Sequence, residues 1–518
     1  MMSGMQILLM VNWLIELITI ASLRKKLSKQ GVETHDSTAN SKSSSSIRNL
    51  FTRFSPLLTA FLVLMAVHLL WLIGTANMPY GLDDIFKKLP LLAIPLVVLT
   101  SSPLNRKQLH LLFFFYIGTI FVATIIGLIR HFTIPDLPYR DTVPFISHIR
   151  FSLNICIAIV LLLWRCYNTS GRVRTLSRFL LLALILWFLS FLLLLRSNTA
   201  FIILFVTAII MLFVYWRRLG KIRAWALTGM VTMTLAIIAI SIYFVRDYYG
   251  DALGKSTDLP QYTVNGNRYK HAYDGFIENG NPVNDYVCHV ELWQQWQKRS
   301  DMAFGDTAIN GCTIFPTLVR YLNAKGLTKD SVGVAQLTEE DIELIEKGVA
   351  NPIYVHGSTV RKMYYTMLFE FERYRVYGDI RNSSLFERFA LWRGAWHLFC
   401  DNPLFGVGTG DYVDALHAQL KADDSQIADT NKHAHNQYLT FLDTFGIVGF
   451  LLIFLSFIIA YRKMRLRTLP AYFAIVVILF LSFLNEDTIE TLAGSVLFTL
   501  IPCLLAKHFN IFQDINDQ

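Results

Sequence analysis

The sequence HAHNQYLTFLDTFGIVGFLLIFLSFIIAYRKMRLR, residues 433–467, places two histidines and an asparagine directly before a long apolar run. The run, residues 438–461, is long enough to cross the roughly 30 Å hydrocarbon core of a bilayer as a helix. A cluster of Lys and Arg follows at 462–467, which is typical of the cytoplasmic end of a membrane span. Titratable groups at the opposite end of the same span are costly and indicate a function there.

Apolar runs of this kind recur along the whole chain. It has 518 residues, of which 53% are hydrophobic and only 16% are charged. We therefore predict an all-α polytopic membrane protein with about eleven transmembrane helices. The predicted spans are 5–22, 54–75, 89–102, 108–129, 149–165, 179–195, 199–216, 223–244, 438–461, 469–484 and 489–506.

The loops between these spans alternate in charge. Basic loops such as RKKLSK (24–29) and RRLGKIR (217–223) alternate with loops that hold few cations, and the positive-inside rule places the basic set in the cytoplasm. The net charge of +9 reflects this bias. No basic–aromatic motif indicates nucleic-acid binding.

Three parts of the chain follow from this pattern. The segment between spans eight and nine is far too long for a simple connector, and its charged amphipathic pieces predict a large, mostly helical periplasmic loop. The parts are an N-terminal bundle of about eight spans (1–244) with a Ser-rich cytoplasmic linker (23–53), the periplasmic loop (245–437), and about three C-terminal spans (438–518).

No cofactor or metal site is predicted. The six cysteines show no CxxC or metal-ligand spacing, although Cys288 and Cys312 could pair in an oxidising compartment. His433 and His435 are two residues apart without a nearby carboxylate pair, and such a pair would point apart on a helix.

The end of the periplasmic loop, SSLFERFALWRGAWHLFCDNPLFGVGTGDY (383–412), predicts an amphipathic helix followed by a tight turn. Arg388 lies one turn before Trp392 on that helix, and the glycines of GVGTG (406–410), Gly408 among them, allow a close-packed turn. No strand precedes the glycines, which argues against a dinucleotide site. An aromatic stripe at three- and four-residue spacing is formed by Leu385, Phe389, Trp392, Trp396 and Phe399.

The order ER...W..A (387–395), NPLFGVGTGDY (402–412) and HAHNQYL followed by FGIVG (445–449) resembles the O-antigen ligase and polymerase superfamily. The signature of that family is His followed by Asn, Ser or Gln, then nine residues, then Gly. His435-Asn436, nine residues and Gly446 fit it here. The resemblance covers nearly the whole chain, and it implies a family with usually twelve spans.

The resemblance implies a multi-pass protein of the Gram-negative inner membrane whose active site faces the periplasm. The expected reaction moves an O-antigen glycan from undecaprenyl diphosphate to lipid A–core, without a metal and with inversion. An O-antigen polymerase or a protein O-oligosaccharyltransferase shares the motif, and both alternatives stay open. A flippase or transporter is disfavoured, because no pair of broken helices marks two repeated halves.

A transfer of this kind needs a base for the acceptor hydroxyl, cations for the diphosphate and an apolar surface for the polyprenyl tail. Histidine suits the first and the planar fork of arginine the second. The family's arginine pattern before the large loop reads LLRSNTA (194–200) here, so Arg196 or Asn198 stands in that place. The predicted site comprises His435 as the base, Arg388, Arg196 and Arg150 for the diphosphate, and Asn436, His433, Trp392 and Gly408 in support.

A plainer interpretation weighs against these roles. The histidines could be interfacial residues, with Asn436 capping the helix, and the arginines could be anchors that reach the head groups. Asp411 is expected to be a turn residue, and Glu486 and Asp487 ordinary loop residues.

Overall fold

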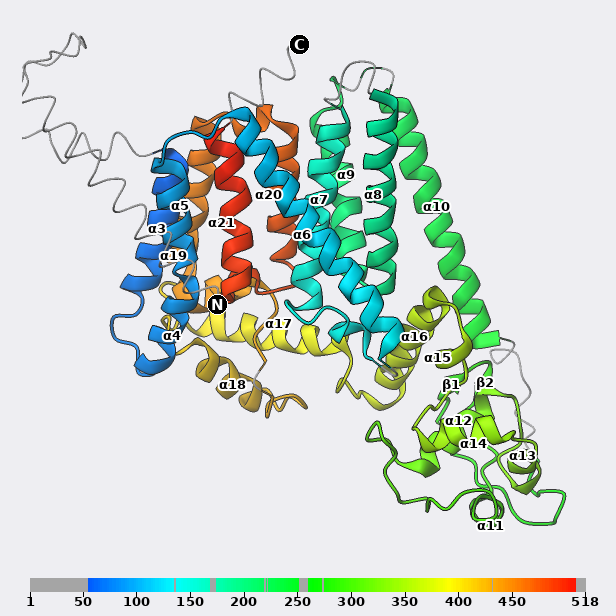
Figure 1. The fold of residues 1–518 in the computed structure, drawn as a ribbon. Helices are drawn as coiled ribbons and strands as arrows, with labels where there is room; N and C mark the ends of the chain where they lie inside the picture. Colours follow the sequence, from blue (N-terminus) through cyan, green and yellow to red (C-terminus); the bar gives the residue numbers. More distant parts are fainter. Residues whose placement is uncertain are drawn as a thin grey trace, which may run out of the picture. The chain divides into compact units, whose positions relative to one another are not determined.

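The computed structural model describes residues 55–134, 137–167, 174–218, 220, 222–250, 260–272, 274–430 and 432–508. The predicted span 5–22 and the linker 23–53 lie outside the described residues. The described chain is mostly helical (Figure 1). Its internal contacts divide it into a first unit, Met1–Trp216 with Arg388–Gln518, and a second unit, Arg217–Glu387.

The first unit holds most of the apolar helices. Five helices among the described residues of the whole chain are long and apolar enough to span a membrane: Arg106–Thr133, His148–Tyr167, Leu176–Leu194, Arg223–Tyr249 and Gln437–Lys463. Four shorter apolar helices add to them. The predicted membrane-helix character is therefore confirmed, and the count of eleven spans stays a prediction.

The helices of the first unit have these bounds: α3 (Pro56–Leu70), α4 (Met78–Lys88), α5 (Pro90–Thr100), α6 (Arg106–Thr133), α7 (His148–Tyr167), α8 (Arg174–Leu194), α9 (Asn198–Val214), α17 (Ser384–Asp401, in this unit from Arg388), α18 (Tyr412–Ala422), α19 (Gln437–Lys463), α20 (Pro470–Ser482) and α21 (Leu492–Lys507). Short 3₁₀ turns are η1 (Tyr139–Asp141), η3 (Leu466–Thr468) and η4 (Thr488–Glu490).

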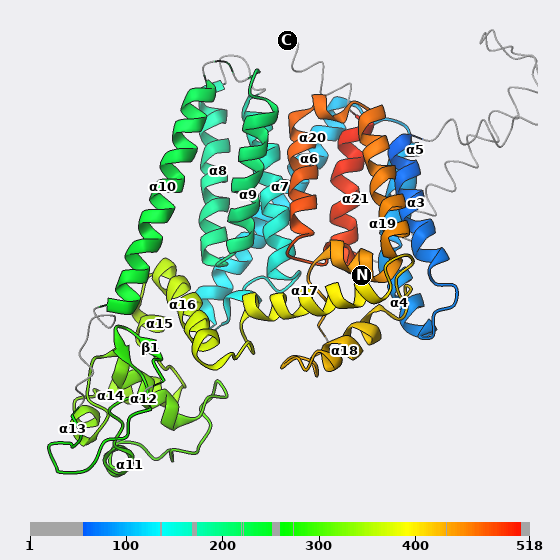
Figure 2. The same ribbon diagram turned by 180° about the vertical axis from the view of Figure 1, so that it is seen from behind.

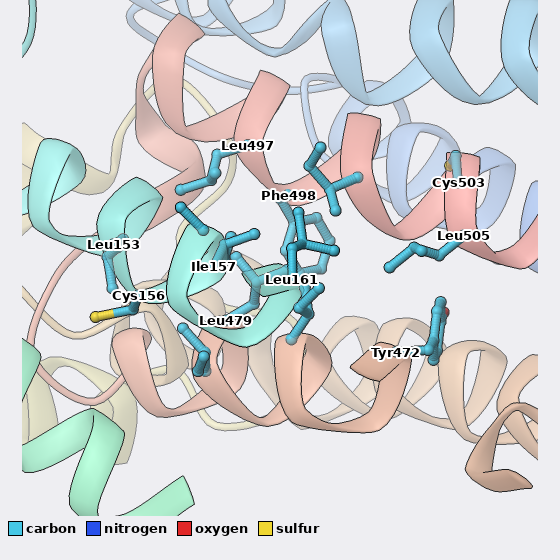
Figure 3. Close-up of a cluster of buried hydrophobic side chains, with 14 of the residues drawn as sticks. Leu153, Cys156, Ile157, Leu161, Tyr472, Leu479, Leu497, Phe498, Cys503 and Leu505 are labelled. Atoms are coloured by element: carbon cyan, nitrogen blue, oxygen red, sulfur yellow. The ribbon is translucent and has the colours of Figure 1, made fainter. Parts of the chain in front are cut away.

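The long helices of this unit run side by side, and α17 crosses their lower ends in both views (Figures 1 and 2). Helix α19 packs along α3, α21 along α5, and α20 against α7 and α9. Figure 3 shows Ile157 and Leu161 of α7 gathered with Leu479 of α20 and Phe498 of α21. This apolar core fixes the ends of the helices, where the polar residues lie.

Helix α19 is interrupted at Gly446, whose backbone is non-helical (φ 61°, ψ −171°). The break releases backbone groups that must find partners. The loop after α17 supplies them: Ile447 N–H donates to the Pro403 carbonyl (2.8 Å), and Val407 N–H donates to the Asp443 carbonyl (2.8 Å). Gly446, at the end of the nine-residue motif, therefore lies where the loop after α17 forms backbone hydrogen bonds with α19.

The second unit pairs α10 (Ile222–Tyr249) with α16 (Thr359–Tyr377) and holds a small domain between them in sequence. The core of that domain contains Trp296, Tyr321 and Leu322, all fully buried. Its elements are β1 (Ile277–Glu278), β2 (Asn281–Pro282), α11 (His289–Trp296), α12 (Ile314–Ala324), α13 (Ser331–Ala335), α14 (Glu339–Glu346) and α15 (Ile353–His356). Strands β1 and β2 form an antiparallel hairpin.

All six cysteines are free thiols in the structure. Cys288 is buried and Cys312 is exposed, so the disulfide between them that the sequence left open is not formed.

Candidate functional site

His435 and Asn436 form the entrance to α19. The Asn436 side-chain oxygen accepts from the backbone N–H groups of Tyr438 (3.1 Å) and Leu439 (3.3 Å), so Asn436 caps the helix as the plainer interpretation held, and its supporting role at the site stays a prediction. His435 has a left-handed backbone (φ 51°), which a non-glycine residue rarely adopts. Such a conformation costs about 1–3 kcal/mol and persists only where neighbours enforce it.

Asp487 holds the backbone of His435 in this left-handed conformation. Its buried carboxylate accepts from the N–H groups of His435 (2.8 Å) and Asn436 (3.1 Å) and from the Thr440 hydroxyl (2.8 Å). Burial raises the pKa of Asp487, and the neighbouring charge of Glu490 raises it further. The loop between α20 and α21 therefore fixes the position of His435.

Glu486, the preceding residue, faces the imidazole. One of its oxygens, Oε1, lies 3.2 Å from Arg150 Nη2, and the other, Oε2, lies 3.7 Å from His435 Nδ1. Burial alone would raise the pKa of Glu486, but contact with His435 and the charges of Arg150 and Arg388 outweigh it and hold that pKa below its usual value. Glu486 is thus a buried, ionised carboxylate in contact with the predicted base.

Two of the three predicted arginines act on this carboxylate, one by contact and one by its charge. Arg150 contacts it directly from the start of α7, and the charge of Arg388 acts on it from α17. The Arg196 guanidinium lies over the ring of Tyr139, 5.2 Å from its centre. The turn that follows Arg196 also reaches the same loop, because Asn485 donates to the Thr199 hydroxyl (2.7 Å).

The supporting residues lie in three different places: just before α19, in the glycine turn and on α17. His433 packs 5.9 Å from the Tyr412 ring, and its buried Nδ1 has no hydrogen-bond partner among the described residues. Gly408 has φ 99° and donates its N–H to the Thr444 carbonyl (3.0 Å), as a close-packed turn requires. Trp392 packs edge-on against Phe389 within the stripe of α17.

A second polar cluster is linked to Gln437, the first residue of α19. The sequence did not predict this cluster. Lys88 Nζ lies between the carboxylates of Asp84 (2.7 Å) and Glu490 (2.6 Å), and all three side chains are nearly inaccessible. Gln437 donates to Glu490 (2.7 Å) and accepts from Ile489 N–H (3.1 Å). The Lys88 charge holds the pKa of Glu490 well below its usual value, against the effect of burial.

The three residues expected to lie in loops or turns do so, but each has defined polar partners there. Glu486 and Asp487 do lie in a loop, but both are buried. The Asp411 carboxylate accepts from the N–H groups of Ala76 (2.9 Å) and Asn77 (2.8 Å) just before α4.

The described residues contain no group of three His, Cys, Asp or Glu side chains that could hold a metal ion.

Part of the site lies in a segment that matches a known family. Residues 357–454 match the family described as O-antigen ligase. The match confirms the predicted relationship to the O-antigen ligase superfamily. It runs from α16 to the middle of α19 and includes Arg388, Gly408, His435 and Gly446.

A curated relative has also been found in Haemophilus influenzae (strain Rd), where it is described as an uncharacterized protein. It is 37% identical over 78 residues, which are 14% of this chain and 19% of the relative. The chain thus matches about a fifth of that protein's length. A family of the O-antigen ligase and polymerase type implies glycosyltransferase-like activity in general, and the particular reaction is a matter for proposal.

Proposed function

We propose that this protein is a glycosyltransferase that moves a preassembled O-antigen glycan from undecaprenyl diphosphate to a sugar of lipid A–core. It would act in the Gram-negative inner membrane, with His435 facing the periplasm. The observation that supports this most strongly is that Arg150 and His435 face the two oxygens of Glu486 where apolar helices end, and that the charge of Arg388 also acts on this carboxylate. Such an end is where lipid-linked substrates present their head groups.

His435 is the proposed base. Its Nδ1 faces Glu486, so Nε2 is the nitrogen that takes the proton from the acceptor hydroxyl. The side chain is 35% exposed, which leaves it open to a substrate. The acceptor oxygen then forms its bond to the anomeric carbon while the bond from that carbon to the diphosphate oxygen breaks. A single in-line displacement of this kind inverts the anomeric centre.

The arginines are the proposed site for the diphosphate. Its negative charge grows as the bond breaks, and guanidinium groups stabilise it through charge-assisted, often paired hydrogen bonds. Arg388 and Arg150 act at the same carboxylate, and Arg196 is the third proposed contact. These cations supply the charge neutralisation in a reaction that we propose to be metal-independent.

Lipopolysaccharide from a deletion strain tests the choice of reaction. The proposal predicts loss of all O-antigen from lipid A–core, with polymer retained on the lipid carrier. A single repeat on the core would instead indicate a polymerase. Unchanged lipopolysaccharide with lost glycoproteins would indicate a protein O-oligosaccharyltransferase.

Cysteine labelling tests the proposed orientation. Lys298→Cys in the second unit and Lys463→Cys at the end of α19 are made in a background lacking the exposed Cys312 and Cys400. With an impermeant maleimide, Lys298→Cys is expected to react from the periplasm and Lys463→Cys only after the inner membrane is opened. Reaction of both from one side would contradict the topology.

A further inference from the structure

We infer that Glu486 is a positioning residue for His435, and that its open carboxylate oxygen Oε2 accepts the Nδ1–H hydrogen bond as Nε2 takes up the acceptor proton. The inference rests on the proposed function, because it assigns a role in that reaction to a residue outside the family segment. It makes Glu486 and His435 a functional pair.

The two oxygens of Glu486 are used differently. Oε1 is held by Arg150 at 3.2 Å, whereas Oε2 is buried and has no hydrogen-bond partner among the described residues. Buried polar atoms of this kind are uncommon and call for an explanation. The polar atom that faces Oε2 is His435 Nδ1, at 3.7 Å.

The separation of 3.7 Å is an ion-pair distance but too long for a hydrogen bond. A shift of about 1 Å brings the two atoms to the 2.7–2.9 Å of a charge-assisted bond. Catalytic hydrogen bonds are often long in unliganded proteins and shorten in the substrate complex. The distance between Nδ1 and Oε2 is therefore expected to shorten when His435 becomes positively charged.

The surroundings keep Glu486 ionised, as the role requires. Arg150 contacts it from α7, His148 of α7 and Arg388 of α17 interact with its charge, and Asp487 adjoins it in the loop. The positive charges of the two arginines explain why its pKa stays low in spite of burial. An ionised carboxylate can accept the Nδ1–H bond without taking the proton itself.

The charge balance of the step is simple. The acceptor proton moves to Nε2, the acceptor oxygen bonds to the anomeric carbon, and the diphosphate leaves with the electron pair of the broken bond. The resulting imidazolium lies beside the Glu486 carboxylate, which stabilises it. His435 returns its proton to water after the products leave, and Glu486 remains a carboxylate throughout.

The neighbouring acid shows what a purely structural role looks like. Asp487 accepts three hydrogen bonds and has no open oxygen, whereas Glu486 has one direct partner and one open oxygen. A structural alternative for Glu486 is that it serves only to hold Arg150. The two roles predict different kinetics.

Turnover by the full-length protein in nanodiscs, with an undecaprenyl-diphosphate-linked glycan and lipid A–core, separates them. Glu486→Gln is expected to lower kcat about 10²-fold at unchanged donor KM, because the neutral amide no longer stabilises the imidazolium. Glu486→Asp keeps the charge and is expected to recover part of the loss. A rise in donor KM at unchanged kcat would mean that Glu486 acts only through Arg150, and would overturn the inference.

A double-mutant cycle adds a sharper criterion. If Glu486 acts through His435, then Glu486→Gln costs almost nothing further in a His435→Ala background. The full loss should persist in an Arg150→Lys background. Additive losses in the His435→Ala background would contradict the pairing.

A measurement without substrate keeps the inference separate from the proposed reaction. The rate at which diethyl pyrocarbonate modifies His435 at pH 8, followed by mass spectrometry of its peptide, reports how strongly Nε2 reacts as a nucleophile. In Glu486→Gln this rate is expected to fall severalfold, because a neutral amide accepts the Nδ1–H bond less strongly and orients the imidazole less well. An unchanged rate would overturn the inference, whereas failure of the wild-type protein to transfer glycan would overturn only the proposed function.

Discussion

Two buried glutamates, one in each unit, differ in how many of their carboxylate oxygens accept hydrogen bonds. Glu291 on α11 accepts from the Thr263 hydroxyl (2.5 Å), Asn267 (2.8 Å) and the Ser331 hydroxyl (2.6 Å), so both of its oxygens have partners. Burial raises the pKa of Glu291, but these hydrogen bonds lower it to about 2. Glu486 is also buried, yet its Oε2 has no hydrogen-bond partner among the residues that the structure describes.

The difference separates a structural acid from a functional one. Glu291 joins α11 to α13 and has no bonding capacity left for a substrate or a base. Glu486 keeps an open oxygen toward His435, at the cost of an unsatisfied buried atom. Removing the first should therefore cost stability, and changing the surroundings of the second should cost activity.

Apart from His435 itself, the largest expected effect is on activity, at Arg388. Removal of one charge-assisted contact to a developing anion costs about 2.7–4 kcal/mol in comparable sites. Arg388→Ala should therefore lower turnover roughly 10²–10³-fold. Arg388→Lys should recover only part of the loss, because lysine keeps the charge without the planar fork. Donor turnover in nanodiscs at matched thermal stability measures both.

Arg393→Ala is the matched control, since Arg393 lies on the same helix with an exposed side chain. It should change turnover little. Full activity in Arg388→Lys would show that Arg388 acts only as an anchor, and the diphosphate would have to be sought at Arg150 and Arg196.

The next effect is on stability, at Asp487, which like Glu291 has both oxygens occupied. Asp487→Asn replaces an accepting oxygen with an N–H₂ group that faces backbone donors. Each buried donor left without a partner costs about 1–3 kcal/mol, so we expect a loss of about 3 kcal/mol. Thermal unfolding of the purified protein measures it.

Asp83→Asn gives the control for this substitution, because the Asp83 side chain is 60% exposed and pairs with Lys87 on its own helix. It should shift stability by less than about 0.5 kcal/mol. Equal losses at the two positions would remove the contrast between buried and exposed acids.

The smallest effect depends on pH and concerns Glu291. Its pKa of about 2 lies below the ordinary 4.5, so its contribution to stability is complete above about pH 4.5 and disappears as pH falls toward 2. Glu291→Gln should cost about 2 kcal/mol at pH 7 and almost nothing near pH 2. Hydrogen exchange of α11 and α13 in the full-length protein, corrected for intrinsic rates, measures this. A cost that does not change with pH would mean that the charge of Glu291 is irrelevant.

Much of the fold followed from the sequence, because length and hydrophobicity decide whether a helix can cross a bilayer. The runs 108–129 and 438–461 proved to be the centres of α6 and α19. The aromatic stripe of 383–400 also formed a helix, α17. The break at Gly446 was not expected, since it depends on hydrogen bonds with the loop 402–408, which lies in a different part of the chain.

The candidate site was only half visible in the sequence. His435, Asn436 and Arg388 stood out through their local spacing in a motif. Glu486 did not, because its partner Arg150 lies 336 residues away and an acidic loop between spans looks solvated in sequence. Burial of that loop is set by packing against the entrance of α19, which periodicity does not encode.

Removal of the imidazole of His435 decides whether this residue is the base of a glycan transfer. Turnover of an undecaprenyl-diphosphate-linked glycan by purified His435→Ala should fall about 10²–10⁴-fold, with donor binding and thermal stability retained. His433→Ala, two residues away, should be milder. Near-wild-type turnover in His435→Ala, or a loss that its lower stability wholly explains, would contradict the proposed role.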